Sequence, residues 1–201
     1  MIRYLGIDPG LSGAVACLEC DDSGTIIKAN VHDIPTVTVL KGKTNRREYL
    51  ANQMAAMLDR YRWWTPQRPI RVLGDDEPAI GGDCIPECPR RVIHMAVIES
   101  VHAMPGNGSI GNFAMGYGLG LWVGILATHA IPYTCVPAPT WKKALAVNKE
   151  KAGCILRAQQ LFPDVADQLT RKKDDGRAEA LLLAEYARRL SPPPERLEKT
   201  G

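Results

Sequence analysis

The stretch YLGIDPGLSG, residues 4–13, decides how this chain folds. Its first half is a short apolar strand that ends in an acid, Asp8, and its second half is a tight turn whose proline and glycines supply the required backbone dihedrals. Residues 14–18 are apolar again, residues 21–24 make a second turn, and residues 25–32 can return as a third strand. The chain is therefore expected to open as a three-stranded meander.

The pattern then changes to helical spacing. Between residues 45 and 63 the apolar side chains recur on one side of a helix, and Thr44 is a suitable N-cap residue. The next stretch, residues 65–91, is rich in proline, glycine and aspartate, which is typical of loops. We interpret it as a loop-rich insertion.

The rest of the chain alternates strands and helices. The expected elements are strands at 94–98 and 131–136 and helices at 110–129, 141–147, 151–162 and 175–190. This order predicts an α/β fold whose mixed sheet is antiparallel over its first three strands, parallel afterwards and flanked by helices. We expect one domain over residues 1–190 and a flexible tail at 191–201.

The composition is that of a globular chain, with 45% hydrophobic and 23% charged residues among 201. A membrane helix needs roughly 20 uninterrupted apolar residues. The longest candidate, residues 113–131, is interrupted by Gly116, Gly118, Gly120 and Gly124. The four-residue spacing of three of these glycines would let a backbone pack closely on a sheet. No signal peptide precedes the first strand, so we expect a cytoplasmic protein without a membrane partner.

The six cysteines do not form a disulfide scaffold in a chain of this length. Cys135, inside an apolar strand, is typical of a small buried hydrophobe. Cys17 and Cys20 should point to opposite faces of their strand, which argues against a metal knuckle. Cys84 and Cys88 lie in the insertion and could supply only part of a zinc site, because zinc needs four ligands.

Acids stand where an active site of an α/β sheet is expected. Asp8 and Glu99 follow apolar strands, and ligands bind at the carboxyl ends of such strands. Asp175 and Glu179 are four residues apart, so both carboxylates project from one face of a helix, whereas Asp174 lies off that face. Four converging carboxylates are costly to ionise unless divalent cations neutralise them, and oxygen ligands favour Mg²⁺ or Mn²⁺.

Two such ions about 4 Å apart can stabilise the attacking and leaving oxygens in phosphodiester hydrolysis. A lysine could steady the developing charge, with Lys151 the first candidate and Lys142 and Lys143 next. Together with Lys149 and Arg177, these residues belong to basic clusters that could bind phosphates, although the net charge of only +3 does not identify such a partner. Each lysine could equally be a solvated surface residue.

Several motifs resemble the RuvC-type Holliday junction resolvases, and one is closest to their phage-encoded, compact branch. The similar segments are residues 6–13 (first strand and turn), 97–99 (second acidic strand), 101–106 (the compact-branch motif), 139–145 with the later Lys151, and 172–181 (closing helix). The resemblance runs over residues 3–190 in the expected order, with residues 65–91 unaccounted for. It implies an RNase H-like fold and an endonuclease that makes paired nicks across a four-way DNA junction.

The same resemblance implies a homodimer, which also suits the two-fold symmetry of such a junction. It also places the loop after Glu99 at the junction core. There His102, Met104 and Phe113 could wedge into or stack on separated bases. The alternative for Phe113 is packing in the first turn of its own helix.

One feature departs from the family pattern, because bacterial members usually close with acids or histidine three residues apart. Here Asp175 and Glu179 are four apart, which leaves open whether Asp174 or Asp175 is the ligand, and Asp175 is preferred.

Other classes of protein are alternatives to a junction resolvase. An actin-type ATPase shares the opening strand and turn, but it would need a second phosphate loop and about twice this length. A non-cutting junction-binding module would need a broken acid set, whereas action on flaps, forks or RNA–DNA hybrids stays open.

Overall fold

The computed structural model describes most of the chain. The described residues are 1–59, 92–103, 106, 108–148 and 152–192. Several sequence predictions lie outside them: the insertion at 65–91, most of the tail, Cys84, Cys88, Met104, Lys149 and Lys151.

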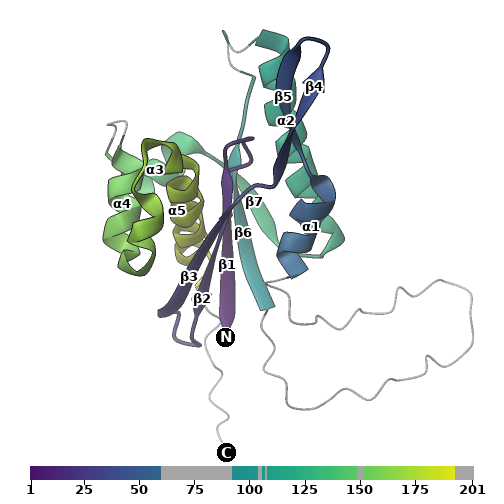
Figure 1. Cartoon of the computed structure of the whole chain (residues 1–201). Helices are drawn as coiled ribbons and strands as arrows, with labels where there is room; N and C mark the ends of the chain where they lie inside the picture. The colour runs from purple at the N-terminus through teal and green to yellow at the C-terminus, as the bar shows by residue number, and fades with distance from the viewer. Residues whose placement is uncertain (60–91, 104–105, 107, 149–151, 193–201) are drawn as a thin grey trace, which may run out of the picture.

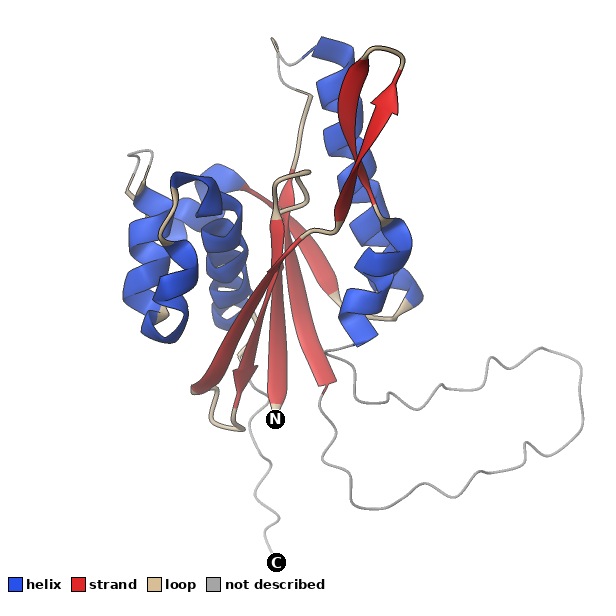
Figure 2. Ribbon diagram, viewed as in Figure 1, coloured by secondary structure: helices blue, strands red, loops and turns tan. Residues whose placement is uncertain are grey.

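A five-stranded sheet forms the centre of the molecule (Figure 2). Its strands are β1 (Ile2–Ile7), β2 (Ala14–Cys20), β3 (Ile26–Asp33), β6 (Val92–Ser100) and β7 (Tyr133–Pro137). They lie in the order β3-β2-β1-β6-β7. The first three pair antiparallel, whereas β6 and β7 continue the sheet in parallel. The predicted mixed sheet is confirmed.

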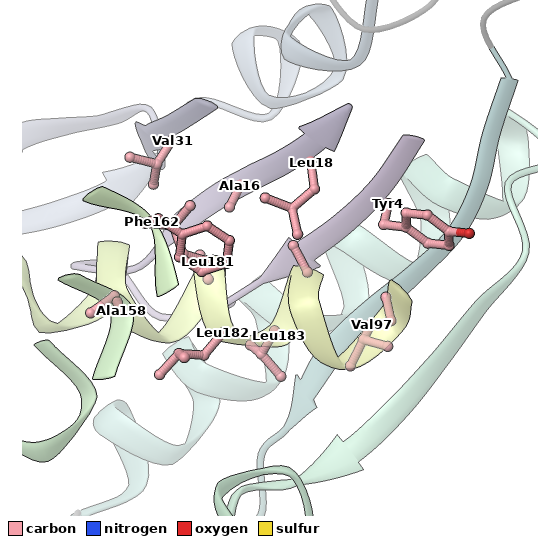
Figure 3. Close-up of a cluster of buried hydrophobic side chains, with 14 of the residues drawn as sticks. Tyr4, Ala16, Leu18, Val31, Val97, Ala158, Phe162, Leu181, Leu182 and Leu183 are labelled. Carbon is pink, nitrogen blue, oxygen red and sulfur yellow. The ribbon is translucent and has the colours of Figure 1, made fainter. Parts of the chain in front are cut away.

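Helices cover both faces of this sheet (Figure 1). On one face lie α1 (Ala51–Asp59) and α2 (Gly108–Thr128). On the other lie α3 (Ala138–Ala144), α4 (Gly153–Leu161) and α5 (Asp175–Leu190), with 3-10 turns η1 (Pro163–Leu169) and η2 (Lys172–Asp174). Because strand side chains alternate between faces, Leu5 and Ile7 join the core under α1 and α2, whereas Tyr4 joins the core under α5 (Figure 3).

Helix α5 lies in backbone contact with strand β1. A Cβ atom on Gly6 would overlap the carbonyl of Ala180 and the amide of Ala184. Apolar and small side chains along most of α5 are buried against the sheet, among them Leu181 and Leu183 (Figure 3). Close packing at Gly6 therefore sets the height of the helix above the carboxyl end of β1.

A β-hairpin replaces the first part of the predicted helix at 45–63. Strands β4 (Thr36–Lys41) and β5 (Thr44–Tyr49) pair antiparallel, and helix α1 begins only at Ala51. The prediction was wrong here because the alternating run from Thr36 is closed by Gly42, whose φ of +65° suits a tight turn. Thr44 donates a hydrogen bond from Oγ1 to the Lys41 carbonyl inside this turn instead of capping a helix.

Helix α2 confirms the helix predicted at 110–129, and its glycines interrupt the apolar run without breaking the helix. It runs for 21 residues and, by length and composition alone, could cross a membrane, with 17% of its most apolar window buried. Gly116, Gly120 and Gly124 face open space, so the prediction that they pack on the sheet was wrong. Gly118 is the helix glycine in close contact, against Tyr49 and the Pro9 carbonyl.

The predictions for the cysteine side chains were only partly confirmed. Cys17 and Cys20 belong to the cores on opposite faces of the sheet, as predicted. The prediction that Cys135 is buried was wrong, because β7 is an edge strand and this side chain is exposed.

Candidate active site

Two of the predicted acids lie side by side at the carboxyl end of the sheet. Strands β1 and β6 pair in parallel with Ile7 opposite Ile98, and Asp8 and Glu99 directly follow these two residues. Ile7 and Ile98 both belong to the core under α2. Because side chains alternate along a strand, Asp8 and Glu99 belong to the opposite face, beneath α5.

The turn after β1 holds Asp8 in place. The amide of Gly10 donates a hydrogen bond to Asp8 Oδ1 over 3.1 Å, and the Asp8 amide donates to the Ala14 carbonyl over 3.0 Å. Gly13 packs so tightly on the turn that a Cβ there would overlap the Asp8 backbone. The glycines of the opening motif therefore fix one carboxylate at the end of its strand.

The beginning of α5 brings the other two acids to the same place. A Cβ on Gly176 would lie 2.6 Å from the Ser12 carbonyl and 3.0 Å from Asp8 Oδ2. Asp175 and Glu179, four residues apart at this end of the helix, therefore stand over Asp8.

Electrostatic coupling shows how close these acids are. Burial, together with the charges of Glu179 and Asp175, raises the pKa of Asp8 to about 7. Burial, followed by the charges of Glu179 and Asp8, raises the pKa of Glu99 to about 7. The structure therefore brings together all four acids that the sequence singled out.

Asp174 and Asp175 have different surroundings. Asp174 is buried and receives hydrogen bonds from the Arg171 amide over 2.8 Å and from Arg171 Nη2 over 2.7 Å. These bonds lower the pKa of Asp174 and hold its carboxylate away from the acid cluster. Asp175 is exposed, and its charge acts on Asp8. The arrangement favours Asp175 as the member of the site.

A lysine already touches the acids. Lys142, on the short helix that follows β7, donates to Glu179 Oε1 over 2.7 Å. Burial lowers the pKa of Lys142, but the hydrogen bond and charge of Glu179 outweigh this, so its pKa lies above the ordinary value. Cys154 Sγ lies 3.5 Å from the same oxygen, and burial raises the pKa of this thiol to about 12.

The sequence ranked Lys142 behind Lys151, which lies outside the described residues. The order of strands could have pointed to Lys142, because β7 continues the parallel sheet beside β6 and Val136 pairs with Glu99. Any residue one or two helical turns after β7 is thereby carried to the same edge of the sheet as the acids.

The donor set suits a hard divalent cation. Glu99 Oε2 is buried without a hydrogen-bond partner in the described part of the chain, an arrangement that a bound cation would satisfy. As the side chains stand, no three His, Cys, Asp or Glu residues among those described are gathered tightly enough to hold one ion. The Lys142 ammonium supplies positive charge at Glu179 in this arrangement.

The remaining predicted DNA contacts fall into two groups. Lys143 and His102 are exposed, and Phe113 is 74% exposed, so its ring packs on its own helix without joining the core. Its ring stacks on that of Tyr117, with centroids 6.1 Å apart and planes 4° apart. Arg177 instead pairs with Asp33 through two contacts of 2.6 Å.

The fold that carries this cluster is that of RuvC, an RNase H-like α/β architecture. The structure of T. thermophilus RuvC in complex with a Holliday junction substrate matches over 90% of each chain, with a TM-score of 0.50 and 14% sequence identity. A second Thermus thermophilus RuvC structure matches over the same shares at 15% identity and a TM-score of 0.50.

A sequence relative adds to this likeness. Over 100 residues, 49% of this chain, the sequence is 32% identical to the chloroplastic Holliday junction resolvase MOC1 of Chlamydomonas reinhardtii. The matched region is 11% of that longer protein. No family model matches the chain.

Proposed function

We propose that this protein is a structure-selective endonuclease that hydrolyses phosphodiester bonds in four-way DNA junctions. One observation carries the proposal: Asp8 and Glu99 meet on paired strands beneath Asp175 and Glu179, and their carboxyl pKa values are raised to about 7 by burial and mutual repulsion. The junction as substrate is supported by the relative that shares 32% identity, a Holliday junction resolvase, and by the RuvC fold.

Two divalent cations, Mg²⁺ or Mn²⁺, are the proposed cofactors, with Asp8, Glu99, Asp175 and Glu179 as their ligands. Bound ions would supply positive charge that activates water and stabilises the leaving oxygen of a phosphodiester. The partnerless oxygen of Glu99 and the all-carboxylate donor set support this assignment.

The chain's own residues have separate tasks in this site. The Gly10 amide orients the Asp8 carboxylate, and the turn and α5 pack closely around it. Lys142 places an ammonium group against Glu179, where it can bind a non-bridging oxygen of the scissile phosphate. We propose Lys142 as the catalytic lysine within the described residues, with Lys151 remaining a candidate outside them.

DNA contacts are proposed on the exposed groups around this edge. Lys143 follows Lys142 on α3 and is free to meet a backbone phosphate. His102 is exposed on the loop after Glu99, and Phe113 and Tyr117 present stacked rings on α2. Exposed aromatic rings of this kind can stack on unpaired bases at a junction.

The exposed face of α2 is proposed as part of a homodimer interface. This helix carries no charged residue, and Gly116, Gly120 and Gly124 have open space beside them. Gly120→Arg should convert a dimer to a monomer in light scattering without loss of stability, because arginine has the higher helix propensity. Leu156→Arg, at a 51% exposed position on α4, is the matched control. Flotation of the wild-type protein with lipid vesicles would instead favour a membrane partner.

The decisive assay uses the purified full chain with Mg²⁺ on labelled four-way junction, flap, linear duplex and RNA–DNA hybrid, each with and without EDTA. We expect symmetric nicks in the junction that EDTA abolishes. Faster cutting of flaps or hybrids would assign a different substrate to the same chemistry. Tight binding to the junction without any cutting would support a binding module instead.

A further inference from the structure

The β4–β5 hairpin is tied to the turn that holds Asp8. Arg47, on β5, donates from Nη1 to Ser12 Oγ over 2.9 Å and from Nη2 to Thr36 Oγ1 over 2.7 Å. Within the described part of the chain, Arg47 makes no salt bridge with an acid. Its guanidinium is therefore fixed beside the turn while its charge stays uncompensated.

A cavity of about 210 Å³ opens at this point. Its walls include Ser12 and Gly13 of the turn, Arg47 of the hairpin, and Arg171 and Lys173 from the segment that leads into α5. We call this cavity the turn pocket. Three cationic side chains from two distant parts of the sequence meet in it.

The acids that also line the turn pocket are already neutralised. Asp33 receives two hydrogen bonds of 2.6 Å from Arg177, and these lower its pKa. Asp174 receives three side-chain hydrogen bonds from Arg171. Lys173, like Arg47, has no salt-bridge partner among the residues that the structure describes. The turn pocket therefore has spare positive charge and suits an anion.

The turn pocket shares a wall with the proposed active site. Ser12 and Gly13 belong to the same turn as Asp8, and Gly176 packs against both the Ser12 carbonyl and Asp8 Oδ2. An extended nucleic-acid strand with one phosphate at the acids would carry another phosphate past the far side of this turn.

We propose that the turn pocket binds a non-scissile phosphate of the DNA strand being cut, with Arg47 and Lys173 as its ligands. The inference rests on the proposed nuclease function and adds to it a site that sets the register of the strand. Arg47 is a positioning residue, since it does not touch the acids that carry the chemistry.

The test uses a series of four-way junctions. In each of them, a neutral methylphosphonate replaces a single phosphate flanking the cut. Affinity is measured in EDTA, and nicking is measured with Mg²⁺. For the wild-type protein, we expect one non-scissile position at which the neutral group weakens affinity about tenfold, as for one lost charged hydrogen bond. Arg47→Ala should weaken binding of the unmodified junction by a similar factor and show no further loss at that position.

Two matched controls separate this role from a structural one. Arg46 neighbours Arg47 on β5 but points to the other side of the strand, and Lys172 precedes Lys173 without lining the turn pocket. Arg46→Ala and Lys172→Ala should both keep the wild-type sensitivity to the neutral group, whereas Lys173→Ala should reduce it.

Two outcomes would overturn the inference in distinguishable ways. If Arg47→Ala loses as much affinity at the sensitive position as the wild-type protein does, Arg47 only anchors the hairpin and the turn pocket is not a phosphate site. If the wild-type protein neither binds nor nicks the unmodified junction, the nuclease proposal fails together with the turn pocket.

Discussion

Helices α5 and α2 cover opposite faces of the same sheet but use their small and apolar residues in opposite ways. Along α5 nine of sixteen residues are buried, and its backbone touches the sheet at Gly6. Along α2 only Gly118, Trp122 and Leu126 are buried among 21 residues, although the helix is apolar on all sides. The contrast teaches that burial against the sheet lets α5 complete the fold and the acid cluster, whereas most of the apolar surface of α2 stays exposed.

The largest expected effect tests the α5 side of this contrast. If the proposed function holds, Asp8→Asn should lower the rate of junction cutting by at least about a hundredfold, because it removes a carboxylate that we propose as a metal ligand. Junction affinity should stay within about twofold, since no phosphate contact is lost. Gel-shift titration and nicking assays on the same preparation measure both. Cutting at the wild-type rate would separate Asp8 from the chemistry.

A pair of glycine substitutions tests the packing difference itself. Gly6→Ala should destabilise the protein by about 3 kcal/mol, because its methyl group would overlap the α5 backbone. Gly120→Ala should instead stabilise it by about 0.5–1 kcal/mol, because that position is open and alanine favours helix. Urea denaturation of the two variants gives the comparison. Equal effects would mean that the two helices do not differ as described.

Without a bound cation, repulsion within the acid cluster should lower the free energy of unfolding. Burial and neighbouring charges raise the pKa of Asp8 from 3.8 to about 7, so ionisation of this group destabilises the folded state. Asp8→Asn should therefore stabilise the protein in EDTA at pH 8, by on the order of 2 kcal/mol. The gain should shrink as the pH falls from 7 towards 4, where the carboxyl group is increasingly protonated in the folded state.

Asp33 provides the control for this pH dependence, because its hydrogen bonds from Arg177 lower its pKa. Asp33→Asn should destabilise the protein at neutral pH, and this loss should disappear below the ordinary pKa of 3.8. Thermal melting of both variants from about pH 2 to about pH 8 distinguishes the two signs. The same trend in both would contradict the difference between a repelling cluster and a paired acid.

The smallest expected effect tests whether DNA binds on the face of the sheet that α5 covers. Lys143→Ala should reduce the slope of log affinity against log salt concentration by about 0.9, the value for one phosphate contact. Lys142→Ala should change the slope less, since that ammonium group already pairs with Glu179. Fluorescence anisotropy between 50 and 300 mM salt, on the order of the range in which such contacts are screened, measures both. An unchanged slope for Lys143→Ala would remove this residue from the interface.

The sequence predicted an element correctly wherever the signal for it lies within a few neighbouring residues. The strand and turn at residues 4–13, the mixed sheet and helix α5 were all predicted, because apolar alternation, tight-turn glycines and four-residue spacing act within a short stretch. The same reasoning failed at residues 45–49, where the alternation that begins at Thr36 and the glycine turn outweighed a helical pattern. Glycine spacing in α2 predicted close packing of Gly116, Gly120 and Gly124 on the sheet, but these glycines face open space and the close contact is made by Gly118, against Tyr49 and the Pro9 carbonyl.

By itself, the sequence determined which carboxylates are available and at which ends of which elements they stand, because both properties depend on neighbours in the chain. Only the tertiary structure decided that Lys142 meets Glu179, that Asp175 lies near Asp8, and that Arg47 reaches Ser12 from a hairpin 35 residues away. Those contacts follow from strand order and from the close approach of α5 at Gly6. Both depend on packing between segments that no local pattern describes.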